Sequence, residues 1–144
     1  MRILLAYDSL SGNTKMVADR VKEALAKQHE VTAFRVSPGQ VYPLQETYDL
    51  YVLGAWTVDY GRTPADMKDF IAELGTKPEH VAIFGTGETQ WGMDYYCGAV
   101  DRLAKYFNSQ YPTLKIEQMP HTAEDEATIQ AWVDDILRLR GASK

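Results

Sequence analysis

The residue types at positions 7–14 suit the binding of an anion. They read Tyr-Asp-Ser-Leu-Ser-Gly-Asn-Thr and lie between a short apolar run and an amphipathic stretch of helical period. Where a strand ends in a glycine-centred turn and a helix begins, backbone N–H groups and the helix dipole favour negative charge. The turn holds no Lys or Arg, and neither GxxxxGK[ST] nor GxGxxG is present. The spacing therefore predicts a site for a terminal phosphate monoester, held by neutral donors from Ser9, Leu10, Ser11, Gly12, Asn13 and Thr14.

Two later segments place aromatic side chains among glycines, each directly after an apolar run. Residues 54–61 carry two aromatics and two glycines, and residues 85–97 carry three of each. Aromatic side chains are ordinarily core material, so their presence in glycine-bearing loops indicates a binding role. Together with the phosphate site they form a slot for a planar cofactor that ends in a phosphate, and flavin mononucleotide (FMN) fits best. The predicted contacts in these loops are Ala55, Trp56, Thr57, Val58, Asp59, Tyr60, Gly61, Thr86, Gly87, Glu88, Gln90, Trp91, Gly92, Tyr95 and Cys97.

Length and composition predict one ordinary globular domain. The chain has 144 residues, 45% of them hydrophobic, a net charge of −5 and a single cysteine. The negative charge argues against nucleic acid and anionic membranes as partners. A lone cysteine cannot form an intramolecular disulfide, which agrees with a reducing compartment, and no signal-peptide core or membrane-spanning run is visible. The three histidines have no metal-ligand spacing. We expect a cytoplasmic protein without a metal or catalytic residues of its own.

The elements that must position these loops alternate along the chain. Strands that are apolar on both faces belong to parallel sheets covered by helices on both sides, so an α/β doubly wound sheet is predicted. One alternating segment reads as a weaker edge strand. The predicted strands are residues 3–6, 31–36 (the edge strand), 50–53, 81–84 and 114–119. The first predicted helix covers residues 14–26, and the second begins near Pro64. The third helix includes Val100 and Phe107, and the fourth includes Ile129 and Leu137.

The three loops, in this order, resemble those of the short-chain flavodoxin family over nearly the whole chain. Residues 7–14 are similar to the family's phosphate loop, residues 54–64 to its second flavin loop, and residues 84–88 with 95–101 to its third. The resemblance implies a single FMN-binding domain over residues 1–144, with a five-stranded parallel sheet in the order 2-1-3-4-5. It also implies a monomeric, low-potential one-electron carrier rather than an enzyme with its own substrate. Its partners would be a flavodoxin or ferredoxin reductase and an acceptor enzyme.

Two departures from the family keep alternatives open. Val58 aligns where the family often has a ring-stacking Trp, so either Trp56 or Tyr60 would cover that flavin face beside Trp91. Residues 90–95 resemble the flavodoxin-like activators of manganese (class Ib) ribonucleotide reductases, which makes such an activator the second reading. A small FMN-dependent reductase and a module that binds a different phosphate ligand are further alternatives. The simplest structural alternative is a helix cap by Ser11 or Asn13, with the tryptophans serving only as packing.

Overall fold

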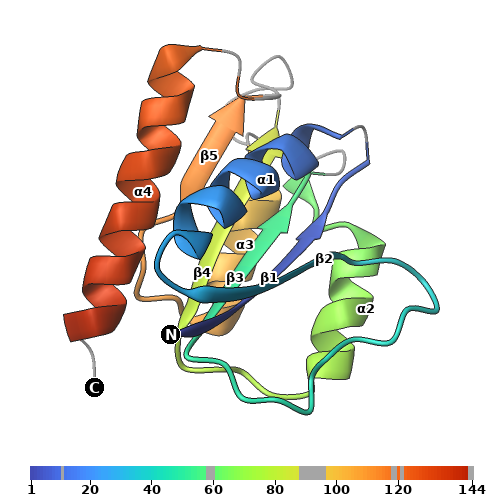
Figure 1. Ribbon diagram of the computed structural model, residues 1–144. Helices are drawn as coiled ribbons and strands as arrows, with labels where there is room; N and C mark the ends of the chain where they lie inside the picture. The colour runs from blue at the N-terminus through green and yellow to red at the C-terminus, as the bar shows by residue number, and fades with distance from the viewer. Residues whose placement is uncertain (11, 58–60, 88–96, 118–119, 121, 143–144) are drawn as a thin grey trace.

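A computed structural model describes residues 1–10, 12–57, 61–87, 97–117, 120 and 122–142. In this part of the chain, strands and helices alternate as the hydrophobic pattern predicts (Figure 1). The elements are β1 (Arg2–Asp8), α1 (Asn13–Ala26), β2 (Glu30–Arg35), β3 (Leu50–Ala55), α2 (Ala65–Leu74), β4 (Val81–Gly87), α3 (Gly98–Phe107), β5 (Leu114–Glu117) and α4 (Ala123–Ala142). The central strands β1, β3 and β4 contain short apolar runs, and each helix has a buried stripe of helical period.

The five strands form one parallel sheet in the order β2-β1-β3-β4-β5, which confirms the predicted topology. β1 lies next to the edge and pairs with two strands, so that Leu5 is opposite Ala33 of β2 and Val52 of β3. The core positions of β1 and β3 are fully buried, whereas β2 has intermediate exposure at its four central residues. The alternating, weaker pattern of β2 therefore corresponds to its place at the sheet edge.

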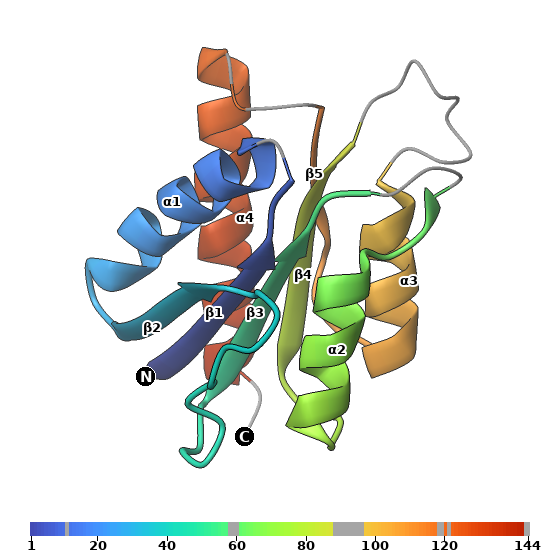
Figure 2. The same ribbon diagram turned by 90° about the vertical axis from the view of Figure 1, so that its right-hand side faces the viewer.

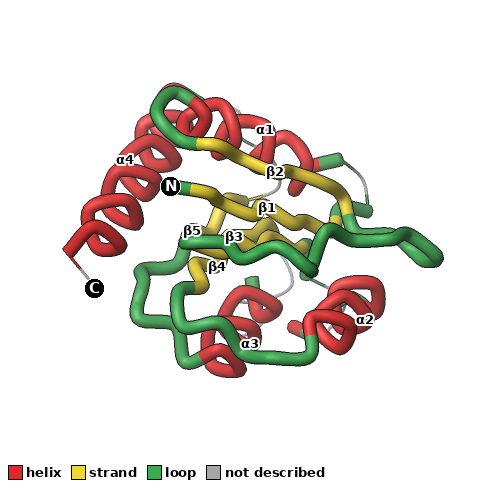
Figure 3. Tube along the Cα trace, turned by 60° about the horizontal axis from the view of Figure 1, so that its bottom comes forward, coloured by secondary structure: helices red, strands yellow, loops and turns green. Residues whose placement is uncertain are grey.

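Helices cover both faces of the sheet. α1 and α4 pack on one face and α2 and α3 on the other, as Figures 2 and 3 show. Two buried clusters fill these interfaces, one around Ile3, Val17 and Ile136 and one around Leu4, Phe70 and Leu103. Adjacent strand residues such as Ile3 and Leu4 enter opposite clusters because side chains alternate across a strand. This alternation explains why the central strands read as continuous apolar runs.

The parallel arrangement brings the carboxyl ends of β1, β3 and β4 to the same end of the sheet, uppermost in Figure 2. The N-terminus of the chain lies at the opposite end. Ligands of open α/β sheets bind beyond the carboxyl ends of the strands, where the strand order reverses. Here the order reverses at β1, because β2 lies on one side of it and β3 on the other. No helix in the described ranges combines the length and the apolar composition needed to cross a membrane.

Candidate functional site

The first loop, defined as residues 9–14, forms a tight turn at the start of α1. Gly12 stands at the N-cap with φ of 96°, a left-handed conformation that favours glycine. The Ser9 hydroxyl oxygen accepts hydrogen bonds from the backbone N–H of Gly12 at 3.1 Å and of Lys15 at 3.3 Å. Ser9 thus shapes the turn and satisfies the third amide of α1, which are tasks the sequence assigned to Ser11 or Asn13.

The turn leaves the beginning of α1 suited to an anion. The amides of Asn13 and Thr14 open the helix, so they have no carbonyl partner within it. Apart from its chain neighbours, no described residue lies within 4 Å of the position that a Cβ of Gly12 would occupy, so a ligand can approach the backbone there. Leu10 projects outward with 70% of its surface exposed. These features provide backbone donors and open space at the positive end of a helix dipole.

Two buried hydroxyl groups connect this loop to β4. The Thr14 and Thr86 side-chain oxygens lie 2.8 Å apart, and both residues are buried. Thr57 of the second loop, defined as residues 54–61, donates its hydroxyl to the Thr86 carbonyl at 3.3 Å. The same Thr57 oxygen accepts from the Ala99 backbone N–H at 3.4 Å, at the start of α3. Predicted contact residues from all three loops are therefore joined in one hydrogen-bond network.

The second loop also packs directly on the start of α3. A Cβ on Gly98 would lie 2.6 Å from the Cα of Gly61, so only glycine permits the two backbones to approach so closely. Cys97, which precedes Gly98, is fully buried, with its sulfur 4.0 Å from the Gly85 carbonyl oxygen. Its thiol therefore belongs to the packing between β4 and α3.

Trp56 is anchored to the end of β1. Its indole Nε1 donates to Asp8 Oδ1 at 3.2 Å, and its backbone N–H donates to the Asp8 carbonyl at 3.3 Å. The indole borders a cavity of about 530 Å³ that lies between the ends of β1 and β2 and the start of α2. The cavity is lined by Asp8, Ser9, Leu10, Arg35, Val36, Ser37, Pro38, Trp56, Pro64, Ala65 and Asp66.

Asp8 is a buried carboxyl group with an unusual environment. It is 5% exposed, and its Oδ2 has no hydrogen-bond partner in the described part of the chain. Burial raises the pKa of the Asp8 carboxyl above its ordinary value, and the nearby Asp66 carboxylate acts in the same direction. The indole N–H of Trp56, the Met67 backbone and the Arg35 guanidinium oppose this increase.

Arg35 brings a cation to the first loop from outside it. The residue ends β2, and its guanidinium donates a hydrogen bond to the Ser9 carbonyl. Residues 9–14 contain no Lys or Arg, and a cation from a neighbouring strand was not predicted. The adjacency of β1 and β2 could have indicated this contact, because carboxyl ends of paired parallel strands meet at one edge.

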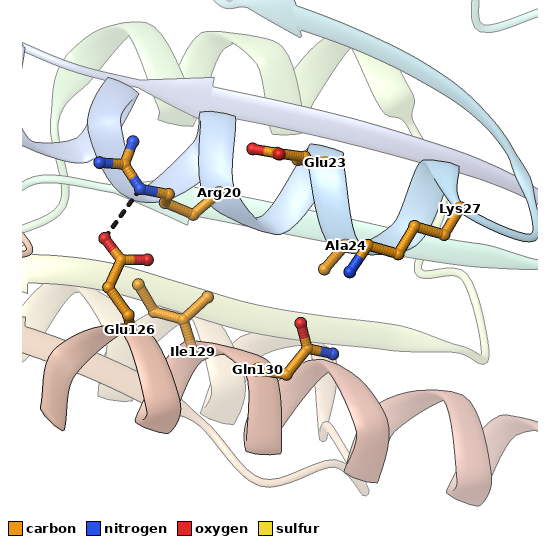
Figure 4. Close-up of a pocket in the computed structure, with 7 residues that line it drawn as sticks. All are labelled: Arg20, Glu23, Ala24, Lys27, Glu126, Ile129 and Gln130. Carbon is orange, nitrogen blue, oxygen red and sulfur yellow. Dashed lines mark hydrogen bonds and ion pairs between the residues drawn. The ribbon is translucent and has the colours of Figure 1, made fainter. Parts of the chain in front are cut away.

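A different hollow lies between α1 and α4, away from these loops. Its volume is about 170 Å³, and Figure 4 shows its lining residues. Arg20 of α1 and Glu126 of α4 approach each other across it, with Nε and Oε1 2.9 Å apart. Both side chains are more than one-third exposed, so this pair is a solvated contact between helices and contributes little to stability. The charged, solvated lining is typical of the surface between two packed helices and does not indicate a ligand site.

The structure brings more than half of the predicted contact residues to one edge of the sheet. These residues are Ser9, Leu10, Gly12, Asn13, Thr14, Ala55, Trp56, Thr57, Gly61, Thr86, Gly87 and Cys97. The other predicted contacts lie outside the described residues: Ser11, Val58, Asp59, Tyr60, Glu88, Gln90, Trp91, Gly92 and Tyr95. Asp8 and Arg35, which line the cavity beside the first loop, are not among the residues predicted from the sequence.

Comparison with known proteins identifies the family. The model of the flavodoxin domain family matches residues 4–134. The chain belongs to this family. It is 31% identical over 140 residues to probable flavodoxin 2 of Bacillus subtilis (strain 168), with 89% of each chain covered. It is 27% identical over 148 residues to the flavodoxin of Nitratidesulfovibrio vulgaris (strain Miyazaki F), covering 94% of this chain and 96% of that protein.

Solved flavodoxin structures share the same fold. The crystal structure of oxidised Flavodoxin 2 from Bacillus cereus has a TM-score of 0.79 at 29% identity and covers 96% of this chain and 99% of its own. Oxidised Flavodoxin 1 from the same organism has a TM-score of 0.83 at 24% identity, covering 96% and 98%. Flavodoxins carry electrons between redox proteins, so the predicted class of electron-transfer protein is confirmed.

Proposed function

We propose that the protein is an FMN-dependent, low-potential one-electron carrier whose first loop binds the 5′-phosphate. The observation that carries this proposal is the start of α1. There the amides of Asn13 and Thr14 are available, the turn is fixed by Ser9, and the space over Gly12 is open. A phosphate monoester matches these donors in size and charge.

The flavin ring would lie between the second and third loops. Trp91 and either Trp56 or Tyr60 would cover its two faces, with the offset geometry of aromatic pairs. The backbones of residues 57–60 and 87–91 would contact the polar edge of the ring, next to the carboxylates of Asp59 and Glu88. Bound FMN supplies the one-electron chemistry, while the chain binds and orients it and sets the surrounding charge.

Redox proteins are the partners, and the finer assignment is part of the proposal. We infer that a flavodoxin or ferredoxin reductase delivers the electron and that an acceptor enzyme receives it. A net charge of −5 favours partners with a basic docking surface, and it makes association faster at low salt. We also infer a monomer in the cytoplasm, which gel filtration and cell fractionation test.

Flavin binding provides the first test. Apoprotein is titrated with FMN and with riboflavin, and quenching of flavin fluorescence gives both dissociation constants. Each lost hydrogen bond to the phosphate costs about 1.5–3 kcal/mol, so riboflavin should bind at least tenfold more weakly. Equal affinities would show that the first loop does not hold the phosphate.

Stepwise anaerobic reduction tests the electron count. A one-electron carrier takes up its two electrons in two separate steps, whereas a flavin reductase shows a single two-electron step. The resemblance to activators of manganese ribonucleotide reductase depends on residues 90–95, which are outside the described residues. An assay with a flavodoxin reductase and a haem protein as acceptor separates the functions. Activation of a manganese ribonucleotide reductase without such relay would replace the proposed carrier role.

A further inference from the structure

The contact between Asp8 and Trp56 joins the starts of the first two loops. Asp8 ends β1 and precedes Ser9, and Trp56 follows the last residue of β3. The pairing Asp8↔Ala55 is the last of the β1–β3 register, so the two loops diverge immediately beyond it. Trp56 donates to Asp8 from both its backbone and its indole, at 3.3 Å and 3.2 Å. This double contact determines where the second loop leaves the sheet.

The second oxygen of the same carboxylate has no hydrogen-bond donor in the described part of the chain. Asp8 is 5% exposed, and no described residue donates to Oδ2. An ionised carboxylate with one oxygen buried and unpaired is costly, and protonation or removal of the charge relieves that cost. Asp8 lines the same cavity as Ser9 and Leu10 of the first loop, so its charge lies on the side of that loop that faces the cavity.

We propose that Asp8 is a positioning residue for the flavin site that also reduces the preference for phosphate-bearing flavins when it is ionised. Its contact with Trp56 positions the second loop for any flavin. Its charge opposes the phosphate dianion only. The inference depends on the proposed binding of FMN at the first loop.

The groups around Asp8 determine when it is charged. Asp66, in the first turn of α2, is the like charge, and Arg35 at the end of β2 is the opposite charge. The Met67 backbone from α2 and the Trp56 indole favour the ionised form. Burial is the largest influence and raises the Asp8 pKa. A phosphate dianion would raise it further, because a like charge disfavours ionisation.

Linkage converts this effect into a measurable ratio. Each unit by which bound FMN raises the Asp8 pKa weakens FMN binding about tenfold at pH above that pKa. The Asp8→Asn variant keeps an oxygen that can accept from Trp56 but removes the charge. We expect Asp8→Asn to bind FMN more tightly than wild type at pH 8, with riboflavin affinity unchanged. The FMN dissociation constant of wild type divided by that of Asp8→Asn should therefore exceed one at pH 8. This ratio should fall toward one as the pH is lowered and Asp8 takes up its proton.

The FMN phosphate also titrates in this pH range. Its titration affects the dissociation constants of wild type and Asp8→Asn equally, so it does not change their ratio. Asp66→Asn serves as a matched control, because it removes a carboxylate that lines the same cavity, whereas the indole N–H of Trp56 is donated to Asp8. Removing that like charge lowers the Asp8 pKa, so the transition in the ratio should move to lower pH when Asp66→Asn is the background. The proposal would be overturned if the ratio of wild-type to Asp8→Asn FMN dissociation constants did not change with pH. It would also be overturned if Asp8→Asn increased the affinity for riboflavin as much as that for FMN.

A second measurement does not depend on flavin. In the ¹⁵N-labelled apoprotein, the indole N–H resonance of Trp56, assigned with Trp56→Phe, should shift with pH as Asp8 titrates. Asp8→Asn should abolish that shift and leave the other indole resonances unchanged. Asp8→Ala and Trp56→Phe should each weaken binding of riboflavin, which carries no phosphate, and the double variant should weaken it by less than the product of the two effects. Independent effects of these two substitutions would remove the positioning role.

The binding measurements distinguish failure of phosphate binding at the first loop from failure of the proposed role of Asp8. If wild-type apoprotein does not prefer FMN over riboflavin, the proposed function of the first loop fails. If wild type prefers FMN and Asp8→Asn leaves that preference unchanged at every pH, only the role of Asp8 fails.

Discussion

The side-chain oxygens of Thr14 and Thr86 lie 2.8 Å apart in the protein interior, where they connect the first turn of α1 to β4. Both residues are buried, so among the described residues each hydroxyl has the other as its hydrogen-bond partner. The sequence predicts that the Thr14 hydroxyl contributes to the phosphate site, whereas in the structure it is directed at Thr86. The backbone N–H of Thr14 opens α1 and is the group suited to the anion.

Valine substitutions test this connection. Thr14→Val or Thr86→Val leaves the other hydroxyl buried without its partner, which should lower the free energy of unfolding by about 1–3 kcal/mol. The double variant removes both polar groups and should be destabilised by less than the sum of the single effects. Urea denaturation of the apoprotein measures all three. Additive losses would show that the two hydroxyls do not interact.

Gly12 offers a test that separates backbone strain from ligand binding. An alanine there occupies a left-handed conformation, with φ of 96°, and should cost roughly 1–2 kcal/mol of stability. The new methyl group also enters the open space over the turn, so FMN affinity should fall in addition. Gly39→Ala is a matched control, since it has φ of 75° and the same open surroundings, and lies in the β2–β3 connection.

Thermal unfolding of the two apoproteins and FMN titrations distinguish the effects. Both variants should lose stability to a similar extent, and only Gly12→Ala should bind FMN more weakly. If both variants retain wild-type FMN affinity, the space over Gly12 is not part of the site.

Arg35 should increase FMN affinity through charge and through its hydrogen bond to the Ser9 carbonyl. Its side chain is exposed, so the electrostatic effect is screened by water and salt. We expect Arg35→Gln to weaken FMN binding about two- to fivefold at low salt, with a smaller effect on riboflavin. The difference should decrease as salt is added.

Arg20→Gln is the control for net charge, because it removes the same charge from the seam between α1 and α4. It should leave FMN affinity nearly unchanged. Equal effects of the two substitutions would mean that only the overall charge of the protein matters.

The arrangement of strands was predictable because burial leaves a clear pattern in the sequence. Residues 3–6, 50–53 and 81–84 are apolar on both faces, and all three belong to central strands. The strands, however, extend beyond these runs to Asp8, Ala55 and Gly87. Parallel pairing continues there through backbone hydrogen bonds, which side-chain polarity does not reveal.

That extension explains why the role of Asp8 was missed. By polarity it looks like the first residue of a solvated loop, yet it is paired opposite Ala55 and buried. The orientation of Trp56 and the reach of Arg35 depend on neighbours distant in sequence, so local patterns do not encode them. The fold class and the loops of the site follow from the sequence, whereas the contacts between loops require the three-dimensional structure.

The buried Asp8 carboxyl should also make the stability of the apoprotein depend on pH. Because its pKa is raised in the folded state, the folded protein binds a proton more tightly than the unfolded chain. The contribution of Asp8 to stability is therefore fully present below its unfolded pKa, near 3.8, and is lost as the pH rises through its folded pKa. Asp8→Asn carries no titrating group at this position and does not incur this loss.

Comparison of the two apoproteins isolates the contribution of Asp8 from that of the other carboxylates. At pH 7–8 we expect Asp8→Asn to be more stable than wild type, because its amide oxygen still accepts from Trp56 without a buried charge. The difference in free energy of unfolding should decrease as the pH is lowered and disappear below the unfolded pKa. Urea denaturation across this range provides the measurement. A variant that is less stable than wild type at pH 8 would show that the ionised Asp8 is stabilised by interactions stronger than the cost of its burial.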